Sequence, residues 1–370
     1  MLINNNEKVK SGLVRENRMT LRTYVITRIL LTIPMVLLLL TLVFVVVRVL
    51  PGDPVLLHFE KRADPEVIEE FRHRLGLDKP LWEQYVDYLW GLLHLDFGKS
   101  MQDFSPVSVQ IFSAFPATLE LAIFSMLVAV GIGTLLGVES ARSYNTPKDH
   151  TIRIFGIVSY AIPVFFLGIV MQIVFGIVLR WLPTGGRTYP GMEPVGAYIK
   201  LPFEFFGIKE IHLATGLYTI DSIFEGNPMK FIQALRYLCL PSITLGLVLS
   251  GVFIRLTRNN MLETLRMDFV TAAKARGLKE RVIIYSYALK NSFLPILTMM
   301  GLQFATLLSG AVLTETTFSW PGLGRYIFTR IGFRDYTAIQ GAVAFFAIMV
   351  AIVSLIVDIL YAYLDPRIRL

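Results

Sequence analysis

The sequence predicts an all-α membrane protein with six transmembrane helices. Hydrophobic residues make up 54% of the 370 residues, charged residues make up only 17%, and the mean hydropathy is +0.58. A soluble protein of this composition would need a very large core, so the chain falls in the membrane class. Six windows of 18 to 26 residues contain no Asp, Glu, Lys or Arg, and about 20 residues are needed to cross a bilayer as a helix. These windows are 29–47, 121–138, 154–179, 237–254, 291–314 and 336–357.

The distribution of positive charge predicts which side of the membrane the termini face. An even number of spans places both termini on one side, together with the loops 140–153 and 255–291. Segments on that side carry 19 Lys or Arg in 85 residues, against 15 in the 143 residues of the opposite loops. Because cytoplasmic loops are enriched in Lys and Arg, we expect a multi-pass protein of the cytoplasmic membrane with both termini in the cytoplasm. The net charge of +7 is then a topology signal, and a nucleic-acid surface is not indicated.

The N-terminal part divides into a tail, a span and an external subdomain. Residues 1–22 form a polar cytoplasmic tail and 23–50 the first transmembrane helix, which we expect to be retained because no small-residue cleavage site follows its apolar run. The turn sequence PGDP then ends the helix. Residues 51–115 are predicted to make a small external subdomain with two amphipathic helices. Their apolar faces are formed by Val67, Phe71 and Leu75 and by Leu81, Tyr85, Tyr88 and Leu92.

The other five spans form one transmembrane domain over residues 116–362, followed by a cytoplasmic C-terminus at 363–370. The second span contains Gly131, Gly133 and Gly137, small residues that favour close packing of helices. An external insert at 182–236 is rich in Gly and Pro at its start and is expected to be mostly irregular up to Pro241. A connection of this length usually has a function.

The sequence does not support catalysis, nucleotide binding or metal binding by this chain. The residues GKS at 98–100 match the last three positions of a phosphate-binding loop motif. That motif also needs a glycine at position 93, which is Leu, and the segment is expected to be external. The five histidines have no close pair, no nucleophile or zinc-protease motif occurs, and the single Cys239 excludes a disulfide within the chain. An ion-coupled carrier remains open but unsupported, because the candidate carboxylates lie only at span ends: Glu120, Glu139, Glu315 and Asp358.

A polar stretch between two apolar spans, DFVTAAKARGLKERVIIYSYALKNSFLP at 268–295, reads as two short helices within the cytoplasmic segment 259–291. Asp268 favours a helix N-terminus, and Gly277 suits the left-handed residue that ends a helix. Pro295 is expected to start the next span. The residues alone leave docking to another protein and contact with lipid headgroups equally open. The two predicted faces are Phe269, Ala272 and Ala273, and then Val282, Tyr285, Leu289 and Phe293.

This stretch resembles the EAA signature of the membrane subunits of ABC importers. The order is Asp, three residues, Ala-Ala, three residues, Gly and then 17 residues to a Pro, with Asp268 where Glu is commoner. Further segments resemble the oligopeptide and dipeptide permease family, in particular the first of its two membrane subunits. These segments are LPGDP, LGLDKPLWEQYVDYLWGLLHLDFGKS, PATLELA, LPTGG, LTRNNMLETLRMDFVTAAKARGL, ETTFSWPGLGR and YLDPRIRL. The polar tail and the insert around 185–235 depart from the family pattern.

The resemblance implies a type I ABC importer fold and a non-enzymatic permease subunit that moves di- or oligopeptides. Its partners would be a second homologous permease subunit, two cytoplasmic ABC ATPases and an extracellular substrate-binding protein. ATP and Mg would be bound by the ATPases, and we expect no cofactor in this chain. Oligosaccharides or nickel complexes are the alternative cargo, and an ion-coupled carrier or channel is the alternative class. The resemblance assigns ATPase docking to Asp268, Ala272, Ala273, Lys274, Arg276, Gly277 and Arg281.

Polar residues in the middle of the spans are the candidates for the translocation path. Each can instead form a hydrogen bond with a neighbouring helix. These residues are Gln172, Gln303, Thr306 and Ser309.

Overall fold

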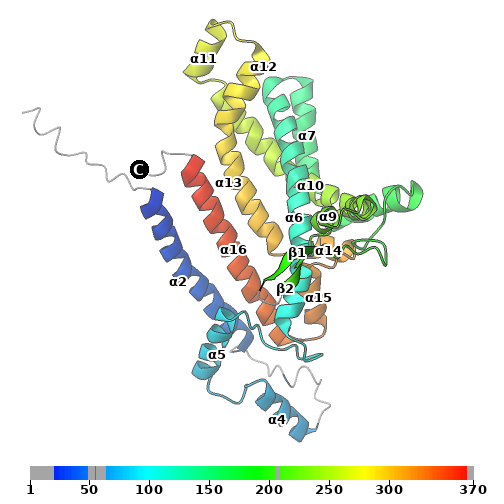
Figure 1. Cartoon of the computed structure of the whole chain (residues 1–370). Helices are drawn as coiled ribbons and strands as arrows, with labels where there is room; N and C mark the ends of the chain where they lie inside the picture. The colour runs from blue at the N-terminus through cyan, green and yellow to red at the C-terminus, as the bar shows by residue number, and fades with distance from the viewer. Residues whose placement is uncertain (1–20, 49–54, 56–63, 206–207, 365–370) are drawn as a thin grey trace, which may run out of the picture.

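The computed structural model describes residues 21–48, 55, 64–205 and 208–364. These residues are mostly helical, with one two-stranded sheet. Long helices run beside one another, with α11 and α12 at one end of the molecule and α4 and α5 at the other (Figure 1). The elements are α2 (Leu21–Arg48), α4 (Pro65–Arg74), α5 (Leu81–Leu93), α6 (Val107–Arg142), α7 (Pro147–Ala161), α8 (Val164–Met171), η1 (Gln172–Val178), β1 (Ala197–Phe205), β2 (Ile208–Leu213), α9 (Tyr218–Phe224), α10 (Pro228–Thr264), α11 (Asp268–Ala275), α12 (Glu280–Val282), η2 (Ile283–Ala288), α13 (Leu289–Leu308), α14 (Val312–Thr317), α15 (Leu323–Gly332) and α16 (Tyr336–Leu364).

The membrane-spanning helices confirm the predicted all-α membrane class, with one span broken. In the described part of the chain, five helical stretches are long and apolar enough to cross a membrane: α2, α6, α10, α13 with the turns before it, and α16. The remaining predicted span consists of α7 and the helix α8–η1, which meet at a bend of 100°. Pro163 explains the break, because proline lacks an N–H and disfavours the helical conformation of the residue before it. Ile162 is accordingly extended, with ψ 126°.

Helix α10 packs closely against α6 in the centre of the bundle. A Cβ atom added at Gly133 would overlap the side chain of Phe253, and one added at Gly137 would overlap Thr257. The third glycine of this helix, Gly131, faces open space. Close helix packing, which the sequence predicted for this span, is therefore confirmed at two of the three glycines.

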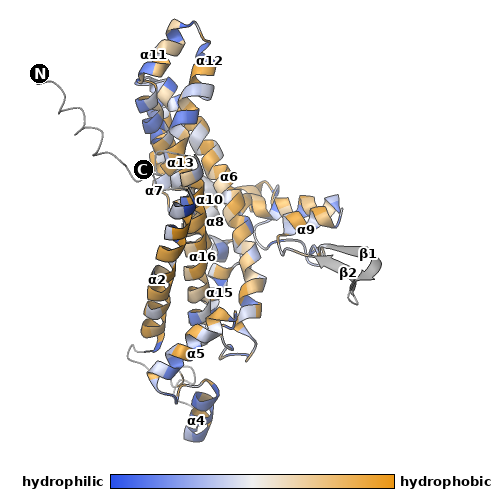
Figure 2. Ribbon diagram, turned by 60° about the vertical axis from the view of Figure 1, so that its left-hand side comes forward, coloured by the Kyte–Doolittle hydropathy of each residue, from blue (hydrophilic) through white to orange (hydrophobic). Residues whose placement is uncertain are grey.

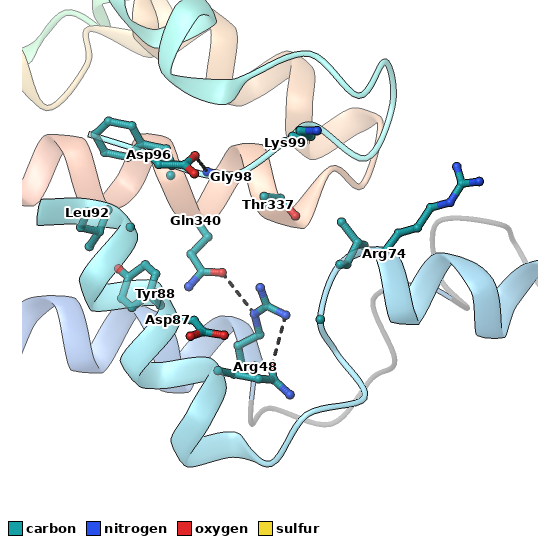
Figure 3. Close-up of a pocket in the computed structure, with 16 residues that line it drawn as sticks. Arg48, Arg74, Asp87, Tyr88, Leu92, Asp96, Gly98, Lys99, Thr337 and Gln340 are labelled. Atoms are coloured by element: carbon teal, nitrogen blue, oxygen red, sulfur yellow. Dashed lines mark hydrogen bonds between the residues drawn. The ribbon is translucent and has the colours of Figure 1, made fainter. Parts of the chain in front are cut away.

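Helices α4 and α5 lie at the end of the molecule opposite α11 and α12, near the last residue of α2 (Figure 1). Of the predicted apolar faces, Phe71 and Leu92 are buried, whereas Val67 is 45% exposed. Arg48, the last residue of α2, connects three elements in a pocket of about 370 Å³. Its Nε donates to Oε1 of Gln340 in α16 at 3.3 Å (Figure 3), and its Nη1 donates to Oε1 of Gln84 in α5 at 3.4 Å.

The external insert is more ordered than the sequence suggested. Strands β1 and β2 pair as an antiparallel hairpin, and α9 follows. Helix α10 already begins at Pro228, because the Asn227 side chain accepts hydrogen bonds from the first turn and proline suits the first helical position. The prediction of an irregular insert up to Pro241 is therefore wrong. Pro241 lies inside α10, and likewise Pro295 lies inside α13 instead of starting it.

A buried ion pair attaches the insert to α6. Arg187 and Glu120 are 7% and 2% exposed, and Nε and Nη2 of the arginine donate to Glu120 Oε2 at 3.0 and 2.7 Å. The other oxygen, Oε1, accepts from the backbone N–H and the hydroxyl of Thr219, both at 2.8 Å. The guanidinium also lies 3.8 Å from the ring centroid of Tyr218. Glu120 thus holds the start of the insert and the first turn of α9 against the same helix.

A second buried carboxylate, Glu315 in α14, organises the loop before α15. Its Oε1 accepts from the hydroxyl of Thr118 at 2.7 Å, and its Oε2 accepts from the backbone N–H of Arg325 at 2.8 Å. The Thr118 hydroxyl in turn accepts from the backbone N–H of Leu323 at 2.8 Å. A side chain at Gly322 would overlap the carboxylate, which explains glycine at that position.

Removal of the cation from the insert should destabilise the fold. In Arg187→Met, Glu120 is left as an unpaired buried charge, which costs about 3 to 5 kcal/mol. We expect a clear fall in the unfolding temperature of the detergent-solubilised protein, followed by size-exclusion chromatography after heating. Adding Glu120→Gln should restore part of the loss, because the buried charge is then gone.

The matched control is Lys148→Met, which removes an ion pair with Glu139 at an exposed site. Exposed pairs contribute about 0 to 1 kcal/mol, so this variant should unfold near the temperature of the unmodified protein. Equal unfolding temperatures for Arg187→Met and Lys148→Met would contradict the attachment role.

Candidate functional site

The polar segment after α10 forms a separate projection at one end of the bundle. Only three residues separate α10 from α11, and this turn is closed by a hydrogen bond from the Met267 N–H to the Thr264 carbonyl at 3.1 Å. α11 and α12 lie at the end of the molecule opposite α4, and both carry hydrophilic residues (Figure 2). The segment therefore extends beyond the apolar part of the bundle while remaining directly connected to its central helix.

Gly277 ends α11 in the way that the sequence predicted. Its φ is +70°, in the left-handed region where residues with a side chain are strained. The Gly277 N–H donates to the Lys274 carbonyl at 2.9 Å, and the Leu278 N–H donates to the Ala273 carbonyl at 3.3 Å. Leu278 then turns back onto a small cluster with Val270, Ala273 and Ile283. The turn fixes the angle between α11 and the following helix.

The seven predicted docking residues divide into an outer set and one inner residue. Ala273 is 4% exposed and packs in the cluster just described. Ala272, beside it in sequence, is exposed, so the two alanines do not share a face. We call the outer set the coupling surface, which consists of Asp268, Ala272, Lys274, Arg276, Gly277 and Arg281, all exposed.

The predicted apolar stripe of the second helix points outward. Val282, Tyr285 and Phe293 are 39%, 45% and 37% exposed, whereas Ile283, Ile284 and Ala288 are buried. These residues still share one face at α-helical spacing, and that face lies on the outside of the projection. A period of 3.6 residues identifies such a face but does not tell whether it points inward or outward.

The projection is attached to the last residue of α6. Arg142 Nε lies 3.1 Å from Glu280 Oε1, and both side chains line a pocket of about 430 Å³ together with Lys274 and Leu278. An exposed pair of this kind contributes little stability. Its effect is to position the start of α12 beside the end of α6.

The four predicted path residues are not gathered into one site. Gln172 lies in η1 and its Nε2 donates to the backbone carbonyls of Thr184 and Thr317 at 2.6 and 3.0 Å, which holds the loop after η1 beside the end of α14. Gln303 and Thr306 lie in α13, and Ser309 directly follows its last residue. Thr306 and Ser309 are exposed but donate to carbonyls of their own helix, and Gln303 contacts Met299.

Sequence reasoning missed an ion pair at the same end of the bundle as the coupling surface. Arg258 of α10 donates from Nε and Nη2 to the two carboxylate oxygens of Asp149 in α7, both at 2.8 Å. Asp149 also accepts from the Ser140 hydroxyl at 2.5 Å and the Asn145 N–H at 3.1 Å, so it joins three helices. The residues are 109 positions apart, and their only sequence signal was a charge next to each apolar window.

Comparison with known proteins finds the same family along nearly the whole chain. A family model described as the binding-protein-dependent transport system inner membrane component matches residues 129–370. A second model, for the N-terminal part of such membrane components, matches residues 21–122.

The similar proteins include three permeases. The dipeptide transport system permease protein DppB of Alkalihalophilus pseudofirmus is 38% identical over 346 residues, which cover 94% of this chain and 99% of that protein. The di/tripeptide transport system permease protein DppB of Pseudomonas aeruginosa is 39% identical, with 89% and 93% covered. The dipeptide transport system permease protein DppB of Escherichia coli K12 is 37% identical, with 94% and 98% covered. Together with the two family models and the membrane-spanning helices, these matches show that the chain is a multi-pass membrane protein that belongs to the family of inner membrane components of binding-protein-dependent transport systems.

Proposed function

We propose that this chain is the permease subunit of an ATP-driven importer that carries di- or oligopeptides across the cytoplasmic membrane. The observation that carries this proposal is the 37 to 39% identity to three dipeptide or di/tripeptide permeases over about nine-tenths of the chain. The relatives are permeases, and the chain accordingly acts as a transport subunit and not as an enzyme. Oligosaccharides, nickel complexes and ion-coupled transport have no comparable support.

The assembly would contain a second homologous permease subunit, two ABC ATPases that bind ATP and Mg, and an external substrate-binding protein. The coupling surface is the proposed contact with an ATPase, on the cytoplasmic side together with both termini. Three features support this role: the surface is exposed, it projects past the apolar bundle, and it follows the central helix α10 after three residues. ATP binding would then act on a two-state permease, and it can shift the two states only as far as its contacts differ between them.

Variants at two neighbouring alanines test docking and folding independently. Ala272→Trp enlarges an exposed position of the coupling surface, so we expect unchanged thermal stability but loss of the ATPases in affinity purification of the whole complex. Ala273→Trp enlarges a position that is 4% exposed, where overpacking costs about 1 to 3 kcal/mol. The second variant should lower the unfolding temperature of the isolated chain. ATPase retention by Ala272→Trp would exclude the proposed docking contact.

A side chain at Gly277 should uncouple ATP hydrolysis from uptake. In Gly277→Val a β-branched residue is forced into φ +70°, so the turn that sets the direction of α12 must change. We expect the protein to reach the membrane, with peptide uptake reduced at least tenfold and ATP hydrolysis by the complex retained in reconstituted vesicles. No atom lies within 4 Å of the added Cβ, so a steric clash is not the cause.

Gly226→Val is the matched control for this experiment. Gly226 has φ +66° and also has open space around an added Cβ, but it lies between α9 and α10, far along the chain from the coupling surface. It carries the same backbone strain without the proposed contact. Equal uptake by the two variants would argue against a coupling role for Gly277.

A further inference from the structure

A basic pocket lies between α7 and α10, on the side of α10 that does not face α6. Its volume is about 410 Å³. Gly156 and Gly251 form part of its wall. They pack closely, because a Cβ added at Gly251 would overlap the Gly156 carbonyl. Phe253 and Thr257 of α10 point instead toward α6. The pocket is lined by Arg153, Gly156, Ile157, Tyr160, Ala161, Gly251, Val252, Ile254, Arg255, Arg258 and Asn259.

Two of its three arginines are unpaired in the described part of the chain. Arg258 is neutralised by Asp149 at 2.8 Å. Arg153 and Arg255 are exposed and have no ion pair or hydrogen bond of their side chains with any described residue. They border the apolar windows of their spans directly, Arg153 in the first half of α7 and Arg255 in the last third of α10, which leads to the coupling surface. The pocket therefore presents two uncompensated positive charges near one membrane boundary.

The pocket also reaches the end of α7, where the broken span bends. Tyr160 and Ala161 line the pocket, and the helix stops there before the bend at Ile162 and Pro163. Pro163 has no N–H, so the carbonyl of the buried Ser159 lacks the donor that an unbroken helix would supply. Non-helical backbone at membrane depth is tolerated only inside protein or beside a water-filled cavity, and discontinuous helices mark substrate sites in transporters. This feature favours a hydrated path over a lipid-covered face.

We propose that this pocket is a subsite on the translocation path that receives the carboxylate of a transported peptide near its exit. Arg153 and Arg255 supply the positive charge, and Arg258 is kept in place by Asp149. A zwitterionic peptide ends in a carboxylate, and guanidinium groups bind carboxylates through charge-assisted hydrogen bonds. The inference about cargo rests on the proposed function.

The test uses the complete transporter in inside-out vesicles, with Cys239→Ser as background. Ile157→Cys places a thiol in the pocket, at a position that is 67% exposed. Val158→Cys, 49% exposed on the same helix but outside the pocket, is the matched control. The thiols are labelled with an anionic and a cationic methanethiosulfonate. For each position we take the ratio of the labelling rate of the anionic reagent to that of the cationic reagent. We expect this ratio to be about tenfold higher at position 157 than at position 158, because clefts of one charge concentrate counter-ions.

Two further measurements test whether the arginines cause this charge preference and whether a peptide occupies the pocket. The double change Arg153→Gln and Arg255→Gln should lower the anionic-to-cationic rate ratio at position 157 to the value found at position 158. A dipeptide with a free C-terminus should slow labelling at 157, and the same dipeptide with a C-terminal amide should not. The peptides reach the pocket directly in this preparation, without the external binding protein.

Three results would contradict the proposed subsite. Failure of both reagents to react at 157 would show that lipid or a partner subunit covers the pocket, and reaction only after anionic lipids are removed would assign it to a lipid headgroup. An unchanged ratio in the Arg→Gln variant would also overturn the subsite. If the transporter carried no peptides, uptake would fail with both arginines intact, whereas the labelling ratio would still be measured, so the two failures can be separated.

Discussion

The close contact between α6 and α10 is the constraint on which the rest of the bundle depends. Gly133 and Gly137 allow the two backbones to approach, and the small pair Gly156 and Gly251 does the same between α7 and α10. With no hydrophobic force between helices inside a membrane, close packing of this kind is what holds them together. α10 thereby becomes a fixed centre, and the coupling surface extends from its end.

Around the N-terminal half of α6, stability comes from polar groups that are buried and paired. Glu120 has a guanidinium on one oxygen and two donors of Thr219 on the other, and Glu315 has the Thr118 hydroxyl and a backbone N–H. Burial of a charge without such partners would be strongly unfavourable. The segment PATLELA supplies Thr118 and Glu120 to two different loops, so one turn of α6 holds both the insert and the loop before α15.

The sequence was sufficient wherever a local rule decides the structure. Apolar windows located the spans, and a glycine after an alanine-rich helix correctly predicted the left-handed turn at Gly277. It was insufficient where tertiary contacts decide. Glu120 was visible only as a carboxylate at a span end, because its partner Arg187 is 67 residues away. The break at Pro163 escaped notice because the window around it is uniformly apolar, and the outward direction of the Tyr285 face could not be predicted because periodicity identifies a face but not what packs against it.

The Asp149–Arg258 pair determines how movement of the coupling surface would reach the membrane. Asp149 accepts hydrogen bonds from α6, from the loop before α7 and from α10, so the ends of these three helices are expected to move together. A displacement of α11 then acts on α7 as well as on α10. At its other end α7 stops at the bend before Pro163, where regular helical hydrogen bonds are interrupted. Hinges are a few element-terminal residues that absorb changes in φ and ψ. The bend is therefore the position at which α7 is expected to rotate against α8, and this rotation would change the shape of the pocket that Arg153 and Arg255 line.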